Sequence, residues 1–118
     1  MIRESCRKDG FNTVCHGAPW QENCLLWSDN ESVQEVMLTN YHHARLCQPA
    51  ADIAILLYTS TSRHQRQEQL ASLLRSYHRT LTETLTTLGH QGDVYPFSQL
   101  FQDYQVSLDC WILVVFAE

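Results

Sequence analysis

One leucine-rich stretch in the second half of the chain constrains the fold most, because its spacing is helical over its whole length. Apolar residues recur there at steps of three and four positions, as they do along one face of an α-helix. Gly89 follows in the position of a helix C-cap. The stretch predicts a long amphipathic helix over residues 63–88 whose apolar face packs into the core, with a partner-binding face as the alternative. That face consists of Leu70, Leu73, Leu74, Tyr77, Leu81, Leu85 and Leu88.

The first third of the chain has strand-like patterning instead. Short β-prone runs alternate with turn-forming residues, of which Ser28-Asp29-Asn30 is the clearest group. Residues 40–48 show no clear period. The pattern predicts a small β-hairpin platform within residues 13–39, built from the runs 13–15, 24–27 and 33–39.

Helical patterning begins after Gln48 and continues to the end of the chain. Pro49 suits the first turn of a helix, which we expect over residues 49–60. A further helix is expected over residues 97–116. The predicted fold class is therefore α+β, with a small β-hairpin platform followed by three principal α-helices. The side chains expected to point inward are Ala50, Ala51, Ile53, Ala54, Leu56 and Leu57 in the first helix and Leu100, Phe101, Tyr104, Leu108, Trp111, Ile112 and Val115 in the last.

Composition narrows the possible functions. The formal net charge is −5, and no stripe of Lys and Arg could pair with successive phosphates, so no nucleic-acid partner is expected. The polar start MIRESCRKDG has no apolar stretch of signal-peptide length, and the most apolar run, residues 110–117, is too short to span a bilayer. These features predict a cytoplasmic protein without a membrane partner.

The cysteines predict free thiols. Five cysteines at irregular spacing, without a secretory context, do not indicate a disulfide framework. The short Cys-x-x-Cys knuckle typical of zinc sites is also missing from the sequence. A zinc site is therefore not expected from the ligand-type residues Cys15, Cys24, His42, His43 and Cys47.

A polar loop lies between two of the β-prone runs and carries the candidate chemistry. It reads His16-Gly17-Ala18-Pro19-Trp20-Gln21-Glu22-Asn23, and Asn40 lies at the end of the following strand run. A hairpin would fold Asn40 back toward Asn23. This is the geometry of a kinase catalytic loop, in which an Asp accepts the hydroxyl proton, an Asn binds Mg²⁺, and a second Asp joins the metal to the phosphates.

The stretches HGAPWQEN and TNYH resemble the ecdysteroid kinase-like (CHK kinase-like) family, which is related to choline kinases and aminoglycoside phosphotransferases. The family loop reads His-Gly-Asp-x-Trp-x-x-Asn and precedes an Ile-Asp-Phe-Gln segment. PAADIA at 49–54 and LLYTST at 56–61 also match, and the resemblance covers roughly residues 11–117. It implies a protein kinase-like fold and the use of ATP and Mg²⁺. Only a short segment precedes the loop, so we expect residues 1–118 to be a partial kinase-like domain, a C-terminal-lobe fragment without the N-terminal lobe.

The resemblance assigns roles to five retained residues. Asn23 matches the metal-binding Asn of the family. His16, Gly17 and Trp20 match structural positions of the catalytic loop, and Asp52 matches the acid at the start of the following helix. A purely structural role is the alternative for each polar member, since His and Asn bond nearby backbone and an acid favours a helix N-terminus. Structural roles are therefore expected for His16 and Asp52.

Two departures from the family pattern matter more. Ala18 stands where the catalytic Asp belongs, so no catalytic residue is retained, and Asn40 stands where the metal-bridging Asp belongs. The metal pair Asn23 and Asn40 is therefore degenerate. Glu22, the one acid within the loop, is expected to face solvent. Loss of a general base costs about 10²- to 10⁴-fold, and Mg²⁺ prefers anionic oxygen to a neutral amide.

These observations predict a degenerate or truncated small-molecule kinase-like protein, a pseudokinase without phosphotransferase activity and without a cofactor of its own. The first alternative is an interaction or regulatory module that pairs with an intact kinase or another chain through an exposed lobe surface. The second is an active ATP-dependent kinase of ecdysteroid-type hydroxyls, which the missing carboxylates disfavour.

Overall fold

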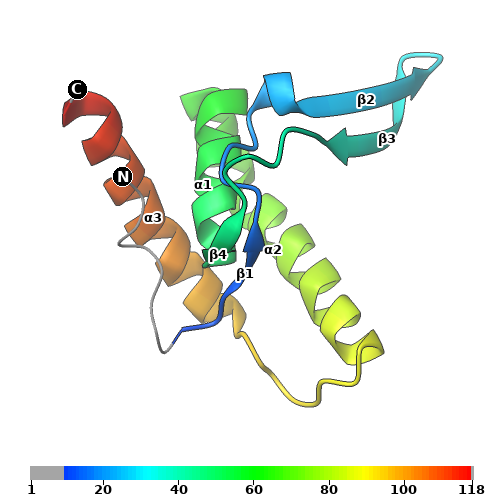
Figure 1. Ribbon diagram of the computed structural model, residues 1–118, viewed down its shortest axis with the longest axis vertical. Helices are drawn as coiled ribbons and strands as arrows, with labels where there is room; N and C mark the ends of the chain where they lie inside the picture. Colours follow the sequence, from blue (N-terminus) through cyan, green and yellow to red (C-terminus); the bar gives the residue numbers. More distant parts are fainter. Residues whose placement is uncertain (1–9, 118) are drawn as a thin grey trace.

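Strands and helices occupy separate parts of the chain in the computed structural model, which describes residues 10–117, with side-chain surroundings described as far as residue 110. The fold is α+β, as the sequence predicts, and no strand follows Cys47 within the described residues (Figure 1). The elements are β1 (Thr13–Cys15), a short 3-10 helix (Gln21–Asn23), β2 (Cys24–Asp29), β3 (Ser32–Leu38), β4 (Arg45–Cys47), α1 (Pro49–Ser60), α2 (Arg63–Thr87) and α3 (Phe97–Ala117).

The strands form two separate antiparallel pairs. The hairpin β2–β3 is the predicted one, but its turn lies at Asn30 and Glu31 rather than at residues 28–30. Both turn residues have positive φ, at 49° and 72°, which is the conformation of a tight type I′ hairpin turn. A register shift between Trp27 and Ser28 adds local twist next to that turn.

Strand β1 does not join this hairpin, which corrects the predicted platform. It pairs instead with β4, with Val14 opposite Leu46. The sequence analysis missed β4 because a strand of three residues is too short to show a period. Its partner β1 is about 30 residues away in the sequence, so only the tertiary fold reveals the pairing.

The three helices have nearly the predicted bounds. Pro49 occupies the first turn of α1, as expected. Helix α2 begins with a capping box that the sequence analysis did not identify: Gln65 N–H donates to Ser62 Oγ at 3.1 Å, and Ser62 N–H donates to Gln65 Oε1 at 2.9 Å. The other end of α2 is followed by Gly89 with φ of 96°, a left-handed conformation that favours glycine.

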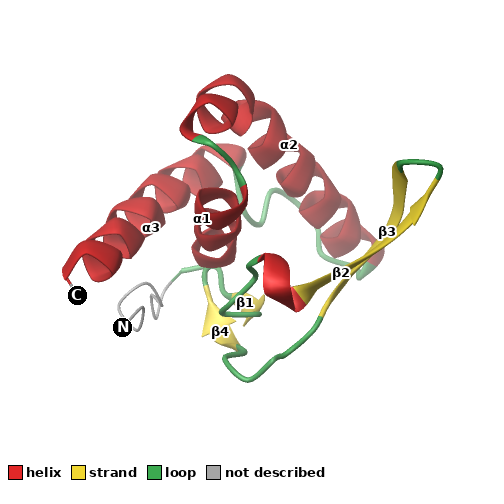
Figure 2. Ribbon diagram, turned by 90° about the horizontal axis from the view of Figure 1, so that it is seen from above, coloured by secondary structure: helices red, strands yellow, loops and turns green. Residues whose placement is uncertain are grey.

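Helix α1 lies inside the angle between α2 and α3, and the main core forms where the three meet (Figure 2). Leu74 is the one fully buried leucine of the predicted α2 stripe, whereas Leu73 and Leu88 are exposed. In α1, Leu56 is exposed, which corrects the prediction that it points inward, and Ile55, which the prediction did not name, is buried. Helix α1 contributes to two buried clusters, so more than one of its sides is covered. The predicted core residues Trp111, Ile112 and Val115 lie outside the described side chains. The main core consists of Ala50, Ala54, Leu57, Leu74, Tyr95, Leu100 and Tyr104.

No helix within residues 10–117 is both long enough and apolar enough to cross a membrane. The hairpin β2–β3 extends away from the helices (Figure 1). The loop that precedes it lies between the strands and the start of α1, which is where the candidate site forms.

Candidate functional site

Asp52 fastens the polar loop to the first turn of α1. Its Oδ2 accepts the backbone N–H of His16 at 2.6 Å, and its Oδ1 accepts the backbone N–H of Gly17 at 2.9 Å. Both bonds have an ionised acceptor, so they belong to the stronger class of protein hydrogen bonds. The carboxylate also lies at the positive end of the helix dipole, as the sequence predicts. Asp52 therefore holds two consecutive loop amides in place.

Gly17 is required by the path of the loop. Its φ of 90° lies in the left-handed region, where a side chain is disfavoured. A Cβ at this position would also collide with the carbonyl oxygen and the Cβ of His43. The loop therefore passes against the segment after β3 at a point where only glycine fits.

His16 joins the loop to the end of β3. Its ring is buried, and Nδ1 accepts the backbone N–H of Ala18 at 3.1 Å. An imidazole nitrogen that accepts carries no proton, so the ring proton lies on Nε2, which donates to the carbonyl of Thr39 at 2.5 Å. His16 also packs against the ring of Tyr41 at 4.7 Å. Both ring nitrogens therefore bind backbone groups.

Asn23 and Asn40 meet as the hairpin argument predicted. Asn23 is buried, and its Nδ2 donates to the carbonyl of Ala18 at 2.9 Å. That bond fixes the orientation of the amide and turns Oδ1 toward Asn40, whose Nδ2 donates to it at 2.8 Å. Asn40 lies at the surface with φ of 61°, a left-handed conformation that asparagine tolerates better than most residues. The two amides close the loop against the end of β3.

Ala18 occupies the interior of the loop, with 2% of its surface exposed. Its carbonyl accepts from the backbone N–H of Trp20 and from Asn23, both at 2.9 Å. The carbonyl of Trp20 accepts the N–H of Asn23 at 2.9 Å and so starts the 3-10 helix. Glu22 is exposed, as expected, and supplies no carboxylate to this interior.

The donor set fits a divalent cation poorly. Mg²⁺ requires oxygen ligands, preferably anionic ones, yet Asn23 Oδ1 already accepts from Asn40 and Ala18 has no side-chain oxygen. Asn40 presents its N–H to the point where a cation would approach Asn23. In the part of the chain that the structure describes, no group of three or more His, Cys, Asp or Glu side chains could hold a metal.

Two buried cysteines lie beside this site, and the thiol of one of them, Cys15, is chemically quiet. Cys15, Cys24, Cys47 and Cys110 are free thiols, and Cys15 and Cys47 are buried between the β1–β4 pair and α1. The Cys15 Sγ donates to the carbonyls of Cys47 and Gln48 at 3.4 Å. Burial, reinforced by the charge of Asp52, raises the pKa of Cys15 to about 12. A thiol of that pKa is not nucleophilic at neutral pH.

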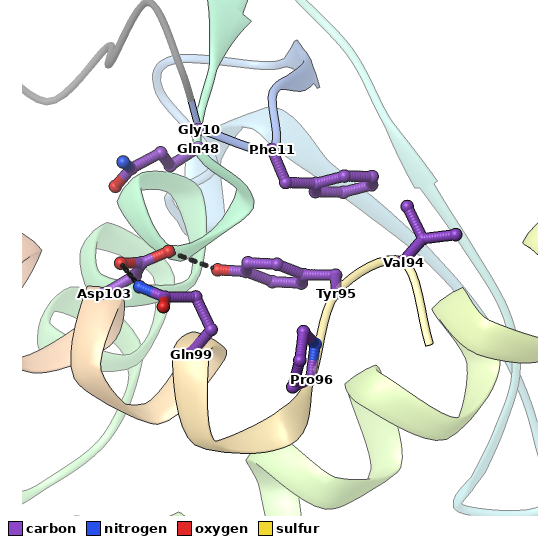
Figure 3. Close-up of a pocket in the computed structure, with 8 residues that line it drawn as sticks. All are labelled: Gly10, Phe11, Gln48, Val94, Tyr95, Pro96, Gln99 and Asp103. Atoms are coloured by element: carbon purple, nitrogen blue, oxygen red, sulfur yellow. Dashed lines mark hydrogen bonds between the residues drawn. The ribbon is translucent and has the colours of Figure 1, made fainter. Parts of the chain in front are cut away.

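A second polar feature, which the sequence analysis missed, lines a pocket of about 310 Å³ (Figure 3). The buried Asp103 accepts from Tyr95 Oη at 2.6 Å and from Gln99 Nε2 at 2.9 Å, and Phe11 stacks on Tyr95 at 4.8 Å. An acid on the apolar face of α3, one residue before Tyr104, is the signal that could have identified it. The bonds connect the segment before α3 to the helix itself.

The class that these features define is a small α+β protein whose polar loop is fastened to a helix start and closed by two amides. Comparison with family models identifies it further. The model of the ecdysteroid kinase-like family matches residues 2–90, and the chain belongs to that family. The predicted resemblance is thereby confirmed, although the match ends before α3. Neither the curated proteins nor the solved structures contain a relative that matches.

Proposed function

We propose that this chain is a catalytically inactive member of the ecdysteroid kinase-like family. The observation that carries the proposal is the hydrogen bond from Asn40 Nδ2 to Asn23 Oδ1, at 2.8 Å. The resemblance places a metal-bridging carboxylate at position 40. Here an N–H group faces the one side-chain oxygen of the loop that would bind the metal.

Ala18 supports the same proposal from the other side of the loop. Its methyl group stands where the resemblance places the general base, and the position is buried. The loop side chains that bond to Ala18 are His16 and Asn23, which bind its backbone, and neither is a carboxylate. Loss of general-base help alone lowers a rate by about 10²- to 10⁴-fold. Poor metal binding at Asn23 and Asn40 would lower it further, because phosphoryl transfer depends on charge stabilisation by the metal.

The order of loop, hairpin and helices supports a protein kinase-like C-terminal-lobe arrangement, and we propose that fold on the strength of the family match. In such an arrangement the retained residues His16, Gly17 and Asp52 keep a structural function. They hold the loop in shape by backbone hydrogen bonds that need neither nucleotide nor metal.

The test compares the wild type with Ala18→Asp/Asn40→Asp. Calorimetric titration of Mg²⁺ should detect no binding to the wild type and measurable binding to the double variant, because two hard anionic ligands then adjoin Asn23. The control Gln67→Glu/Gln69→Glu adds equal charge to the exposed face of α2 and should behave as the wild type. Asn40→Asp alone covers the case in which the buried Asp at position 18 prevents folding.

Activity is measured as transfer of radiolabelled phosphate from ATP to an ecdysteroid or amino-alcohol hydroxyl. The wild type should give none. Transfer by the wild type that Asn23→Ala abolishes would refute the proposal, because it would mean that the loop still binds metal and catalyses.

A second candidate, an interaction module, is favoured by a specific observation. The β2–β3 hairpin exposes large apolar side chains, among them Trp27 and Val36 at 48% and 58% of their surface. Exposed apolar surface of this kind is typical of protein-binding sites.

A further inference from the structure

The β2–β3 hairpin is apolar on both of its faces and projects from the helices (Figure 1). Its base is held by the N–H of Thr39, which donates to the carbonyl of Asn23 at 2.8 Å. A two-stranded hairpin is marginally stable in water unless something covers one of its faces. The large apolar side chains that it exposes are Leu25, Leu26, Trp27, Val33, Val36 and Met37.

The hairpin also offers backbone groups to a partner. Its sheet contains β2 and β3 alone, so each strand keeps one edge that pairs with no other described strand. Such an edge is a template for an added strand. The type I′ turn at Asn30 and Glu31 fixes the register of the two strands, so the edge is formed before a partner arrives.

The charge of the hairpin specifies the chemistry of that partner. Asp29, Glu31 and Glu35 lie on it, and the sequence has no Lys or Arg between residues 20 and 44. All three acids are exposed, and within residues 10–117 none of their carboxylates has a hydrogen bond or an ion pair. The hairpin therefore combines apolar surface with unneutralised negative charge.

One cross-strand pair is suited to a cation. Trp27 lies directly opposite Glu35, so the two side chains project from the same face of the hairpin. Trp27 is 48% exposed, and Glu35 is exposed as well. A guanidinium or ammonium group between these two side chains would contact the Glu35 carboxylate and the face of the Trp27 indole, the aromatic ring that binds cations best.

We propose that the β2–β3 hairpin is a docking site for an extended basic segment of another protein, which adds to the hairpin as a strand. An Arg or Lys of that segment lies between Trp27 and Glu35, and its apolar residues cover one face. A second copy of this chain is the poorer occupant, because it would bring the acids of two hairpins together. The proposal rests on the interaction-module candidate and is independent of the loss of catalysis.

The experiment measures binding of a fluorescent peptide, Arg-Val-Arg-Val-Arg-Val-Arg, to the full chain by anisotropy. The same peptide with Glu in place of Arg is the peptide control. Trp27→Leu and Glu35→Gln should each weaken binding of the basic peptide by about fivefold, through loss of the cation–π contact or of the charge. Glu68→Gln, which removes an exposed charge from α2, is the matched protein control and should leave binding unchanged.

Hydrogen exchange locates the bound peptide. Amides along one edge of Cys24–Asp29 or Ser32–Leu38 should become protected in the complex. The proposal is wrong if Glu68→Gln weakens binding as much as Glu35→Gln, because binding then follows net charge alone. It is also wrong if the basic peptide does not bind, or if sedimentation shows a dimer whose hairpin amides are already protected. None of these results depends on the phosphate-transfer assay, so the two proposals can fail separately.

Discussion

Replacement of Asp52 by Asn tests the contact that holds the loop on α1. The carboxylate accepts two backbone N–H groups, from His16 and Gly17. An amide keeps one accepting oxygen but turns its NH₂ toward the other N–H, so one loop amide loses its acceptor. Hydrogen bonds to charged groups contribute about 1.5–3 kcal/mol each, and a buried unsatisfied donor costs about 1–3 kcal/mol. We therefore expect Asp52→Asn to lower the free energy of unfolding by about 2–4 kcal/mol.

Urea unfolding followed by circular dichroism measures this loss. Asp93→Asn is the matched control, since Asp93 is exposed and has no partner among the described side chains, and it should change the free energy by less than about 0.5 kcal/mol. Hydrogen exchange at the amides of His16 and Gly17 should accelerate by about 30-fold or more. A loss below about 0.5 kcal/mol with unchanged exchange at these amides would refute the role of Asp52.

Three further predictions follow from the loop, the hairpin turn and the buried thiol. Gly17→Ala should lower the free energy of unfolding by about 1–3 kcal/mol, and by more than Gly92→Ala, because Gly92 shares the positive φ but has open space around it. Glu31→Gly should stabilise the fold by about 0.5–1 kcal/mol in urea unfolding, because φ at this turn residue is 72°; an equal or lower stability would contradict the turn geometry. The pKa of Cys15 is raised to about 12 from an ordinary 9.0, so its thiol ionises at lower pH in the unfolded chain than in the folded protein. Its contribution to stability is therefore full well below pH 9 and is lost as the pH rises through 9 toward 12. Between pH 9 and 10 the loss from Cys15 should amount to about 1 kcal/mol, and burial of Tyr77 and Tyr104, whose pKa values are also raised, adds to the fall as the pH approaches 10. Cys15→Ala keeps both tyrosines, so a variant with the same fall between pH 9 and 10 would exclude Cys15 as a cause.

The helices were predictable because their signals are local. Pro49 at a helix start, Gly89 past a helix end and a periodic leucine stripe each depend on a few neighbouring residues. Burial within the helices was less predictable. Leu73 and Leu88 belong to the α2 stripe yet are exposed, because α2 makes its buried contact mainly through Leu74. The lengths and crossing angles of the neighbouring helices decide which part of an amphipathic face is buried. The local sequence pattern of one helix does not contain this information.

The sequence predicted which residues of the site lie close together, but not which hydrogen bonds they form. Asn23 and Asn40 lie at the two ends of the predicted hairpin, and this alone predicted that they are neighbours, as the structure confirms. The acceptors of the loop amides were not evident, because Asp52 reaches residues 35 and 36 positions earlier in the sequence. The same holds for His16, whose ring binds the carbonyl of Thr39 across the hairpin. The roles that the resemblance assigns to these residues stay predictions.

The neutral residues at positions 18 and 40 are physically linked through Asn23. The Ala18 carbonyl accepts a hydrogen bond from Asn23 Nδ2, so Asn23 Oδ1 faces position 40. That oxygen needs a hydrogen-bond donor or a cation there. Asn40 supplies the donor. An Asp at position 40 would present a second acceptor to this oxygen, and, being at the surface, would turn toward water and leave the buried Oδ1 without a partner unless a cation lay between them. Ala18 provides no further ligand for such a cation. The amide of Asn40 therefore supplies the donor that closes the loop without a metal.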